Sequence, residues 1–506
     1  MGIVLGLDVG TSGTKAIAMD AAGKLLASAL VEYPLHSPKP NWAEQDPADW
    51  KRAAFEALAQ LAAKIDPAEV KGIGLTGQMH GSVFLDAENK VLRPALLWCD
   101  QRTARQCDDI TAKVGEKRLL EMVSNPALTG FTAPKILWLR DNEPEVYEKV
   151  RKVLLPKDYI RFELTGEFAT DVADASGTLL FDVKNRTWHK ELMSILGIDA
   201  AFMPPSFEGP EVTGVLSKAA AEKTGLPAGI PVVAGGGDQA AGGVGCGIVR
   251  TGVLSASLGT SGVVFAFADA VSTDPEGRVH TFCHAVPGKW HVMGVMLSAG
   301  GALQWFRNRL CAEEMALAKT SGRDAYEYIT EAAAEVPAGC EGLIFLPYLT
   351  GERTPHKDPF AKAAFIGLSL RHTKAYMARA VLEGVAFGMR DGLEIIRSMG
   401  VEVREVRASG GGARSALWRR ILADTGRAPM VTINVDEGPA YGAAILASVA
   451  AGMYAKVEDA CDAIIAETAR VSPDEAAAAV YDGWFREYQD AYRALAPAYK
   501  RIAAML

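Results

Sequence analysis

The sequence predicts an α/β protein of two domains, on three observations. The chain has 506 residues, whereas a single hydrophobic core stops growing at about 250–300 residues. Short apolar runs that end in glycines or polar residues alternate with longer segments of helical periodicity, as in α/β proteins. A strand–turn–strand pattern at the start of the chain recurs nearly half a chain later, and such self-similarity indicates a duplicated unit.

The first copy of this pattern covers residues 3–20. An apolar run ends at Asp8, a turn follows, and alternating apolar residues resume, which predicts a β-hairpin. Glycines in the turn let backbone N–H groups approach an anion, and hydroxyl groups add donors; the candidates are Thr11, Ser12 and Thr14. A phosphate would repel Asp8, so its expected role is to hold Mg²⁺. A hairpin that binds nothing is the alternative, and it is the commoner use of such a turn.

The second copy covers residues 254–267, and its turn contains Gly259 and Thr260. Ser257 stands where the first copy has Asp8, so only the first hairpin is expected to hold a metal. Two phosphate-binding turns with one carboxylate suit a nucleotide whose β- and γ-phosphates are held from both sides.

Composition and charge exclude several classes of partner. The chain is 49% hydrophobic and 23% charged, which is typical of a soluble globular protein. Its formal charge is −8, without a basic block, so we expect neither nucleic acid nor a membrane as a partner. The seven cysteines are scattered and form no C-x-x-C pair, and the start of the chain has no signal-peptide core, so we expect a cytoplasmic protein. The oligomeric state stays open, with a homodimer as one alternative.

Polar residues follow two predicted strands in the first half. Residues 70–76 read as a buried strand that delivers Gln78, Met79 and His80 between glycines, and strand ends line the ligand crevice of open α/β sheets. A core histidine bonded to a backbone carbonyl is the equal alternative for His80. Asp100 follows the next strand, where it could bind a hydroxyl group or form an ion pair that caps the following helix.

Glycine-rich junctions mark three further places. In residues 230–247 an apolar strand runs into three glycines, then Asp238 and Gln239, then a helix of small residues. Asp238 is the best general-base candidate, and a simple helix cap is its alternative. A second small-residue helix is predicted at residues 438–447. The turn at 408–415 can place an adenine or ribose against Gly411 and Gly412, or can be a plain strand–helix turn. The alanine-rich segment from about residue 458 to the end is expected to be helical.

Two phosphate hairpins, two small-residue helices and a late glycine turn resemble the arrangement of the actin-like ATPase superfamily. Within it, residues 130–138 and 363–383 are similar to the two characteristic segments of the FGGY carbohydrate kinases. Residues 77–81 and 98–103 resemble those of the members that phosphorylate D-xylulose, whereas glycerol-phosphorylating members carry Arg-Glu in place of Met79 and His80. The resemblance extends over essentially the whole chain.

This resemblance implies two ribonuclease-H-like domains flanking a deep cleft. Residues 1–244 would bind the sugar and carry the first phosphate hairpin, and residues 245–506 would bind the nucleotide and carry the second. It further implies ATP, Mg²⁺ and transfer of the γ-phosphoryl group to the 5-hydroxyl of D-xylulose. Asp238 would act as the base, and Asp8 would position Mg²⁺ through water. The implied sugar contacts are Met79, His80, Gln78, Asp100 and Gln239. The implied contacts to phosphates and adenosine are Thr11, Ser12, Thr14, Gly259, Thr260, Gly411 and Gly412.

Other functions remain as alternatives. Cys99 departs from the family pattern, in which a polar residue such as Asn often precedes the aspartate, and this departure bears on sugar preference. Another FGGY sugar or polyol kinase, acting on ribulose or gluconate, is the nearest alternative. A nucleotide-switched filament or chaperone with the same core is a more distant one, against which the segment from Gln78 to Gly81 argues.

Overall fold

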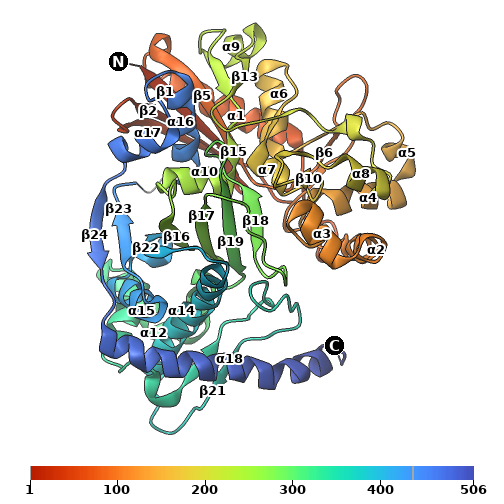
Figure 1. Cartoon of the computed structure of the whole chain (residues 1–506). Coiled ribbons are helices and arrows are strands. Elements are labelled where there is room, and N and C mark those ends of the chain that lie inside the picture. The colour runs from red at the N-terminus through yellow and green to blue at the C-terminus, as the bar shows by residue number, and fades with distance from the viewer. Residues whose placement is uncertain (1, 436–437, 506) are drawn as a thin grey trace. The chain divides into compact units, whose positions relative to one another are not determined.

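The computed structural model describes residues 2–435 and 438–505. Its contacts divide the chain into two compact units, each with a β-sheet and helices (Figure 1). The first comprises Met1–Arg250, Phe267–His291 and Glu437–Ile465, and the second comprises Thr251–Ala266, Val292–Asp436 and Ala466–Leu506. The predicted α/β class is confirmed in both units.

The sheet of the first unit contains the predicted N-terminal hairpin. Its strand order is β13-β14-β5-β1-β2-β3, and β15 pairs with β5 at the far end of that strand. The strands are β1 (Ile3–Val9), β2 (Gly13–Asp20), β3 (Leu25–Glu32), β5 (Val70–Gly77), β13 (Val212–Val215), β14 (Pro231–Val233) and β15 (Gly236–Gly237). β1 is antiparallel to β2 and parallel to β5, so the turn at residues 10–12 lies at the carboxyl end of β1.

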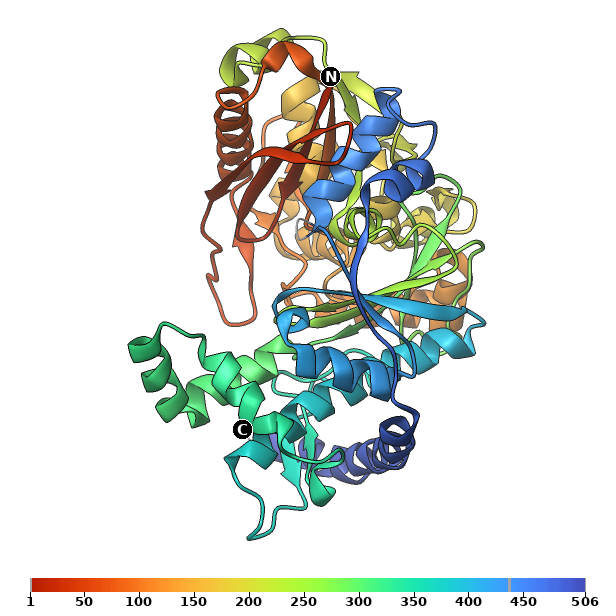
Figure 2. The same ribbon diagram turned by 90° about the vertical axis from the view of Figure 1, so that its left-hand side faces the viewer.

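Helices α1 (Pro47–Ala62) and α16 (Gly438–Ala450) cover opposite faces of this sheet (Figure 2). Because successive side chains of a strand point to opposite faces, Leu5 packs with Trp50 of α1 in one hydrophobic core, while Gly6 faces α16. A Cβ atom on Gly6 would lie 1.9 Å from the Ala440 carbonyl oxygen. Glycine therefore lets α16 rest directly on the strand backbone.

The predicted small-residue helix after Asp238 is α10 (Asp238–Gly245), and it packs on α16 within the first unit. A Cβ atom on Gly442 would lie 1.8 Å from the Ala241 carbonyl oxygen, so small residues are required where the two helices meet. Both predicted helices are confirmed.

The remaining elements of the first unit surround this core. The helices are α2 (Ala104–Val114), α3 (Glu116–Val123), α4 (Thr132–Asn142), α5 (Pro144–Tyr147), α6 (Pro156–Thr165), α7 (Val172–Ser176), α8 (Lys190–Leu196), α9 (Lys218–Thr224) and α17 (Val457–Ile464). The short strands are β4 (Glu44–Gln45), β6 (Val83–Leu85), β7 (Ala95–Leu96), β8 (Lys152–Leu154), β9 (Thr170–Asp171), β10 (Phe181–Asp182), β11 (Thr187–Trp188), β12 (Ser206–Phe207) and β18 (His280–Cys283).

The sheet of the second unit repeats this topology. Its order includes β19-β17-β16-β22-β23-β24, with β16 (Gly252–Leu258), β17 (Gly262–Ala268), β19 (Trp290–Met296), β22 (Val403–Ser409), β23 (Met430–Ile433) and β24 (Glu467–Val471). β16 is antiparallel to β17 and parallel to β22, as β1 is to β2 and β5. The duplication predicted from the two Gly-Thr-Ser-Gly turns is confirmed at the level of strand pairing.

Helices and a small hairpin complete the second unit. They are α11 (Gly300–Leu310), α12 (Ala312–Ser321), α13 (Ala325–Ala334), α14 (Lys374–Ser398), α15 (Ala416–Gly426), α18 (Glu475–Ala503), β20 (Ile344–Leu346) and β21 (Ala364–Ile366). The segment from about residue 458 to the end was expected to be helical. It is helical only in part, because β24 lies within it and pairs antiparallel with β23.

On α14, buried Glu383 accepts hydrogen bonds from Arg379 Nε at 2.7 Å and from the Tyr481 hydroxyl of α18 at 2.9 Å.

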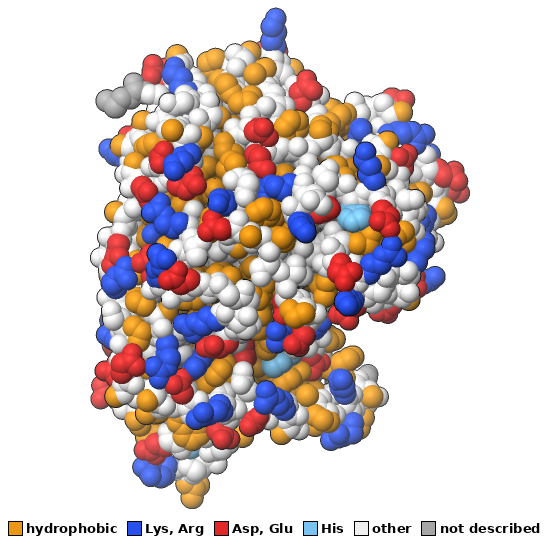
Figure 3. Space-filling model, in the orientation of Figure 1, with side chains coloured by type: hydrophobic (Ala, Val, Ile, Leu, Met, Phe, Trp, Pro, Cys, Tyr) orange, Lys and Arg blue, Asp and Glu red, His pale blue; other side chains and the backbone are white. Residues whose placement is uncertain are grey.

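Acidic and basic side chains are interspersed over the face drawn in Figure 3. Among the helices of the described chain, none has the length and apolar character needed to cross a membrane.

Candidate active site

The turn of the first hairpin has its carbonyl groups bonded to the protein. The Gly10 N–H donates to Gly13 O at 3.1 Å, and the Tyr33 N–H donates to Ser12 O at 3.3 Å. Gln45 Nε2 donates to Thr11 O at 2.7 Å, and the Tyr33 hydroxyl donates to Gly10 O at 2.6 Å. Within residues 2–435 and 438–505, neither the Thr11 nor the Ser12 N–H has an acceptor. The turn therefore keeps two backbone donors for an anion, as a phosphate site requires.

The residues that carry hydroxyl groups near this turn differ in how far they are exposed to solvent. Ser12 is exposed and Thr11 is half-buried. Thr14 is fully buried on β2, and its hydroxyl donates to the Tyr33 hydroxyl at 3.4 Å. Thr14 thus packs beneath the turn, and its predicted contact with a phosphate has no support in this geometry.

Asp8, near the end of β1, and Asp238, which follows β15, lie at the same end of the sheet on either side of β5. Asp8 pairs in register with Thr76 of β5, and Gly237, which precedes Asp238, pairs with Gly77. Gly237 is the N-cap residue of α10, and no side-chain cap bond is made there. The alternative role of Asp238 as the helix cap is therefore not what this structure has.

The electrostatics of the two carboxylates fit a cation. Burial, together with repulsion by Asp238, raises the pKa of Asp8 from 3.8 to about 7. Burial raises the pKa of Asp238 to about 6, against hydrogen bonds from Gln239 that lower it. Asp8 Oδ1 is buried without a hydrogen-bond partner among the described residues. A divalent cation near Asp8 would satisfy this oxygen and relieve the repulsion.

Met79 and His80 follow β5 directly. Met79 is buried, and a Cβ atom on Gly237 would lie 2.8 Å from its Cγ atom, so Met79 packs against the residue that precedes Asp238. His80 has a φ of 66°, which is unusual for a residue with a side chain. Its carbonyl oxygen accepts hydrogen bonds from Lys135 Nζ at 2.7 Å and from the Thr132 hydroxyl at 3.1 Å. These donors hold His80 in that conformation.

The imidazole of His80 has one nitrogen fixed by the backbone. His80 Nδ1 lies 2.7 Å from Gly177 O; because a carbonyl oxygen only accepts, Nδ1 must carry the proton. In a neutral ring Nε2 then holds the lone pair and can accept a hydrogen bond from a hydroxyl group. The ring is half-buried, with its centroid 4.9 Å from that of Phe131. The sequence left two alternatives for His80, a histidine bonded to a backbone carbonyl and a residue that contacts a ligand. The structure shows the carbonyl bond, and it also leaves the imidazole partly exposed.

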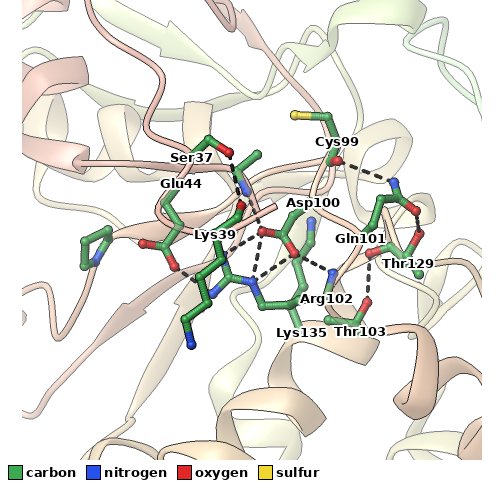
Figure 4. Close-up of polar contacts among 12 residues, drawn as sticks. Ser37, Lys39, Glu44, Cys99, Asp100, Gln101, Arg102, Thr103, Thr129 and Lys135 are labelled. Carbon is green, nitrogen blue, oxygen red and sulfur yellow. Dashed lines mark hydrogen bonds and ion pairs between the residues drawn. The ribbon is translucent and has the colours of Figure 1, made fainter. Parts of the chain in front are cut away.

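The Asp100 carboxylate is occupied by protein donors (Figure 4). It is fully buried and accepts hydrogen bonds from Arg102 Nε at 2.9 Å, from Arg102 Nη2 at 2.7 Å and from the Ala43 N–H at 2.7 Å. Arg102 also donates to Glu44 and lies 3.6 Å from the Trp42 ring centroid. This geometry is that of the ion-pair alternative. A contact between Asp100 and a hydroxyl of the sugar stays a prediction, and the geometry does not favour it.

The remaining two side chains of the predicted sugar site lie differently. Gln239 Nε2 donates to Asp238 Oδ1 at 3.4 Å, so Gln239 lies beside the candidate base. Gln78 is 1% exposed, and its amide is bonded to residues of the first hairpin and to Gln45.

The second unit contains a cavity of about 560 Å³, which is within the range of small-molecule sites. Its lining includes Gly259, Thr260, Gly411 and Gly412, which the structure thus brings together. A Cβ atom on Gly411 would meet open space, whereas one on Gly410, where φ is 81°, would lie 2.9 Å from Leu258 O. The backbone of Gly411 is therefore uncovered at the wall of the cavity.

Comparison with known proteins decides the family. A family model for the N-terminal domain of the FGGY family of carbohydrate kinases matches residues 3–245, and the model for the C-terminal domain matches residues 254–451. The chain belongs to the FGGY family of carbohydrate kinases. It is therefore a sugar kinase that uses ATP, and its fold is the actin-like ATPase fold of that family.

The relatives of this FGGY kinase include enzymes with different sugars in their names. Xylulose kinase of Escherichia coli (strain K12) is 43% identical over 448 residues, which cover 88% of this chain and 90% of that protein. A crystal structure of a xyloylose kinase from Brucella ovis is 39% identical with a TM-score of 0.90, covering 98% of this chain and 100% of that chain. A gluconate kinase from Lactobacillus acidophilus has a TM-score of 0.93 at 28% identity and covers 99% of both chains.

Several residues of this FGGY kinase's candidate site had no signal in the sequence. Tyr33 and Gln45 bond to the first turn from distant segments, and no motif marks them. Trp98 lies in the motif at residues 98–103, but nothing in that motif shows that its Nε1 atom donates to the Thr11 hydroxyl. In the second unit, α11 and α13 line the cavity beside the predicted glycines. Their lining residues are Gly300, Gly301, Leu303, Gln304, Tyr326, Glu327 and Thr330.

Proposed function

We propose that this FGGY kinase transfers the γ-phosphoryl group of ATP to the 5-hydroxyl of D-xylulose. The observation that carries the proposal is the placement of Asp8 and Asp238 on either side of β5, at the end where the first turn keeps two N–H donors. The similarity to the Escherichia coli xylulose kinase supports the choice of sugar.

Asp238 is proposed to accept the proton of the attacking hydroxyl. A pKa of about 6 leaves this carboxylate ionised at neutral pH and more basic than an ordinary aspartate, which suits a general base. Gln239 holds the carboxylate through its bond to Oδ1. Met79 and His80 are proposed to contact the sugar, with His80 Nε2 accepting a hydrogen bond from one of its hydroxyl groups.

The phosphate groups are proposed to bind backbone donors and hydroxyls. In the first unit these are the N–H groups of Thr11 and Ser12, and in the second they are Gly259 and Thr260, with adenosine against Gly411 and Gly412. Mg²⁺, held by Asp8 through water, would supply charge neutralisation on the phosphates. Phosphoryl transfer depends mainly on such positioning and charge stabilisation, which is what these groups provide.

We also propose a domain boundary near residue 244 in the sequence, which the extents of the two family models support; two later segments, Phe267–His291 and Glu437–Ile465, pack with the first compact unit. The free cysteines, most of them buried, support a location in the reducing cytoplasm. For the oligomeric state we propose a homodimer, to be checked by analytical ultracentrifugation.

A panel of acceptors with coupled detection of ADP tests the proposed function. D-xylulose is expected to give a kcat/KM at least tenfold above those of D-ribulose, gluconate and glycerol, with D-xylulose 5-phosphate as the product. A higher kcat/KM for gluconate would favour the alternative that the gluconate kinase neighbour raises. ADP formation that no acceptor changes would contradict a sugar kinase altogether.

A further inference from the structure

A pair of buried glutamines lies beneath the first phosphate turn. Gln45, from β4, and Gln78, which follows β5, are each 1% exposed. Gln78 Nε2 donates to Gln45 Oε1 at 2.9 Å. The two amides come from segments 33 residues apart in sequence and meet at the hairpin that carries Asp8.

The hydrogen-bond partners fix how the Gln45 amide is oriented. Its Oε1 atom accepts from Trp50 Nε1 at 3.0 Å as well as from Gln78, and its Nε2 atom donates to Thr11 O at 2.7 Å and to Pro34 O at 3.2 Å. Exchanging the oxygen and nitrogen would set donors against donors and acceptors against acceptors. The amide therefore has one orientation, in which it holds the Thr11 carbonyl.

Gln78 holds the other side of the turn. Its Nε2 atom donates to Gly10 O at 3.3 Å, and its Oε1 atom accepts from the Thr11 hydroxyl at 3.3 Å. The Thr11 hydroxyl in turn accepts from Trp98 Nε1 at 3.0 Å. The carbonyls of Gly10 and Thr11 and the Thr11 side chain are thus all fixed by protein partners. Among the described residues, the backbone N–H groups of Thr11 and Ser12 have no acceptor.

We propose that Gln78 and Gln45 are positioning residues for phosphoryl transfer. By holding the carbonyls of Gly10 and Thr11, they leave the N–H groups of Thr11 and Ser12 directed at the transferring phosphoryl group. Gln78 acts through the turn and does not touch the sugar, because its side chain is buried and its amide is bonded to the hairpin. This inference rests on the proposed function, in which the turn binds a phosphate.

The test compares Gln78→Leu and Gln45→Leu with a matched control, Gln106→Leu. Gln106 is also buried in the first unit, at 3% exposed, but its amide donates to Asp141 on α4 and not to the turn. We expect kcat to fall roughly 10- to 100-fold in the two turn variants, since misplacing a reacting group by about 1 Å can cost about 100-fold. The KM for D-xylulose should stay within about threefold of wild type. Gln106→Leu, which also removes a buried amide, should leave kcat within about twofold of wild type.

Two further variants distinguish an effect on the position of the turn from an effect on the stability of the fold. Tyr33→Phe removes one hydroxyl donor to Gly10 O at 2.6 Å and should lower kcat without raising the sugar KM. The double variant Gln45→Leu/Gln78→Leu should lose no more than about threefold beyond the worse single variant, because both act through one turn. A Gln78→Leu enzyme that keeps its kcat within about threefold, or whose only defect is a tenfold higher sugar KM, would overturn the inference.

The wild-type enzyme distinguishes this inference from the proposed function. If wild type phosphorylates a sugar other than D-xylulose, the proposed substrate fails, and the kcat ratios are measured with that sugar. If wild type phosphorylates no sugar, the ratios are measured on its ATP hydrolysis. A fall of that hydrolysis in the turn variants, but not in Gln106→Leu, would still support the positioning role, and an equal rate in all of them would contradict it.

Discussion

Replacing Asp8 by asparagine is expected to stabilise the protein in the absence of Mg²⁺ and nucleotide while removing most turnover. Burial and the Asp238 carboxylate raise the pKa of Asp8 from 3.8 to about 7. Between these values the folded chain holds a proton that the unfolded chain has released, so the free energy of unfolding falls as the pH rises from about 4 to about 7. The charged Asp8 carboxylate therefore destabilises the fold at neutral and alkaline pH.

The size of this effect follows from the change in proton affinity. Each tenfold change is worth about 1.36 kcal/mol. The raised pKa of Asp8 then costs on the order of 4 kcal/mol of the free energy of unfolding at pH 8 and on the order of 2 kcal/mol at pH 5. Asparagine has nearly the same shape without the charge, so the Asp8→Asn variant should gain most of this free energy, and the gain should be about 2 kcal/mol larger at pH 8 than at pH 5.

Urea denaturation at pH 5 and pH 8, without Mg²⁺ or nucleotide, measures the gain. Asp86→Asn is the control, because the Asp86 side chain accepts from the N–H groups of Glu88 and Lys90 in an exposed turn, and asparagine keeps an acceptor there. The control should change the free energy of unfolding by less than about 1 kcal/mol at either pH. The result would show that charged Asp8 does not destabilise the fold if Asp8→Asn is no more stable than wild type at pH 8. The same conclusion would follow if its gain in the free energy of unfolding does not grow with pH.

Three further predictions concern the base, the coupling between the sugar and phosphoryl sites, and the packing of α16. The acid limb of kcat/KM should have its midpoint near 6, because burial raises the pKa of Asp238 to about 6; a profile that stays flat down to pH 5 would argue against Asp238 as the base. ATP hydrolysis without sugar should be slow and should rise with 5-deoxy-D-xylulose, which lacks the accepting hydroxyl; a release of ADP that this analogue leaves unchanged would count against coupling between the sugar and phosphoryl sites. Gly74→Ala should lower the free energy of unfolding by about 3 kcal/mol or more, because the new Cβ atom would lie 1.8 Å from Ala443 O. Gly72→Ala, whose Cβ atom would lie 3.2 Å from Ala447 O, should lower it clearly less. Equal losses of unfolding free energy in the two variants would show that α16 can shift.

The sequence predicted those parts of the site that depend on local turn chemistry. Gly-Thr-Ser-Gly between two apolar runs favours a hairpin, so both hairpins and their repeated strand pairing were predictable. The proximity of Asp8 and Asp238 was also predictable, because Asp8 lies near the end of one strand, Asp238 follows another, and parallel strands end at the same edge of a sheet.

What could not be predicted is where a side chain points once its strand has ended. Gln78 turns inward because Gln45, from a distant segment, supplies its partner, and Asp100 is buried because Arg102 folds back on it. Thr14 lies within β2, and its hydroxyl contacts Tyr33 because the pairing of β2 with β3 sets which face it is on. Residues 467–471 form a strand in spite of their alanine-rich surroundings because β23 offers them an edge. In each case a tertiary contact overrides the local signal.

The proposed phosphoryl transfer depends most directly on Asp238, and one measurement on Asp238→Asn tests this role. Binding of D-xylulose by isothermal titration and turnover with saturating ATP are measured on the same preparation. We predict a dissociation constant within about threefold of wild type and a kcat that is roughly 100- to 10,000-fold lower, as expected when a general base is removed. A kcat within about threefold of wild type would show that Asp238 is not the general base.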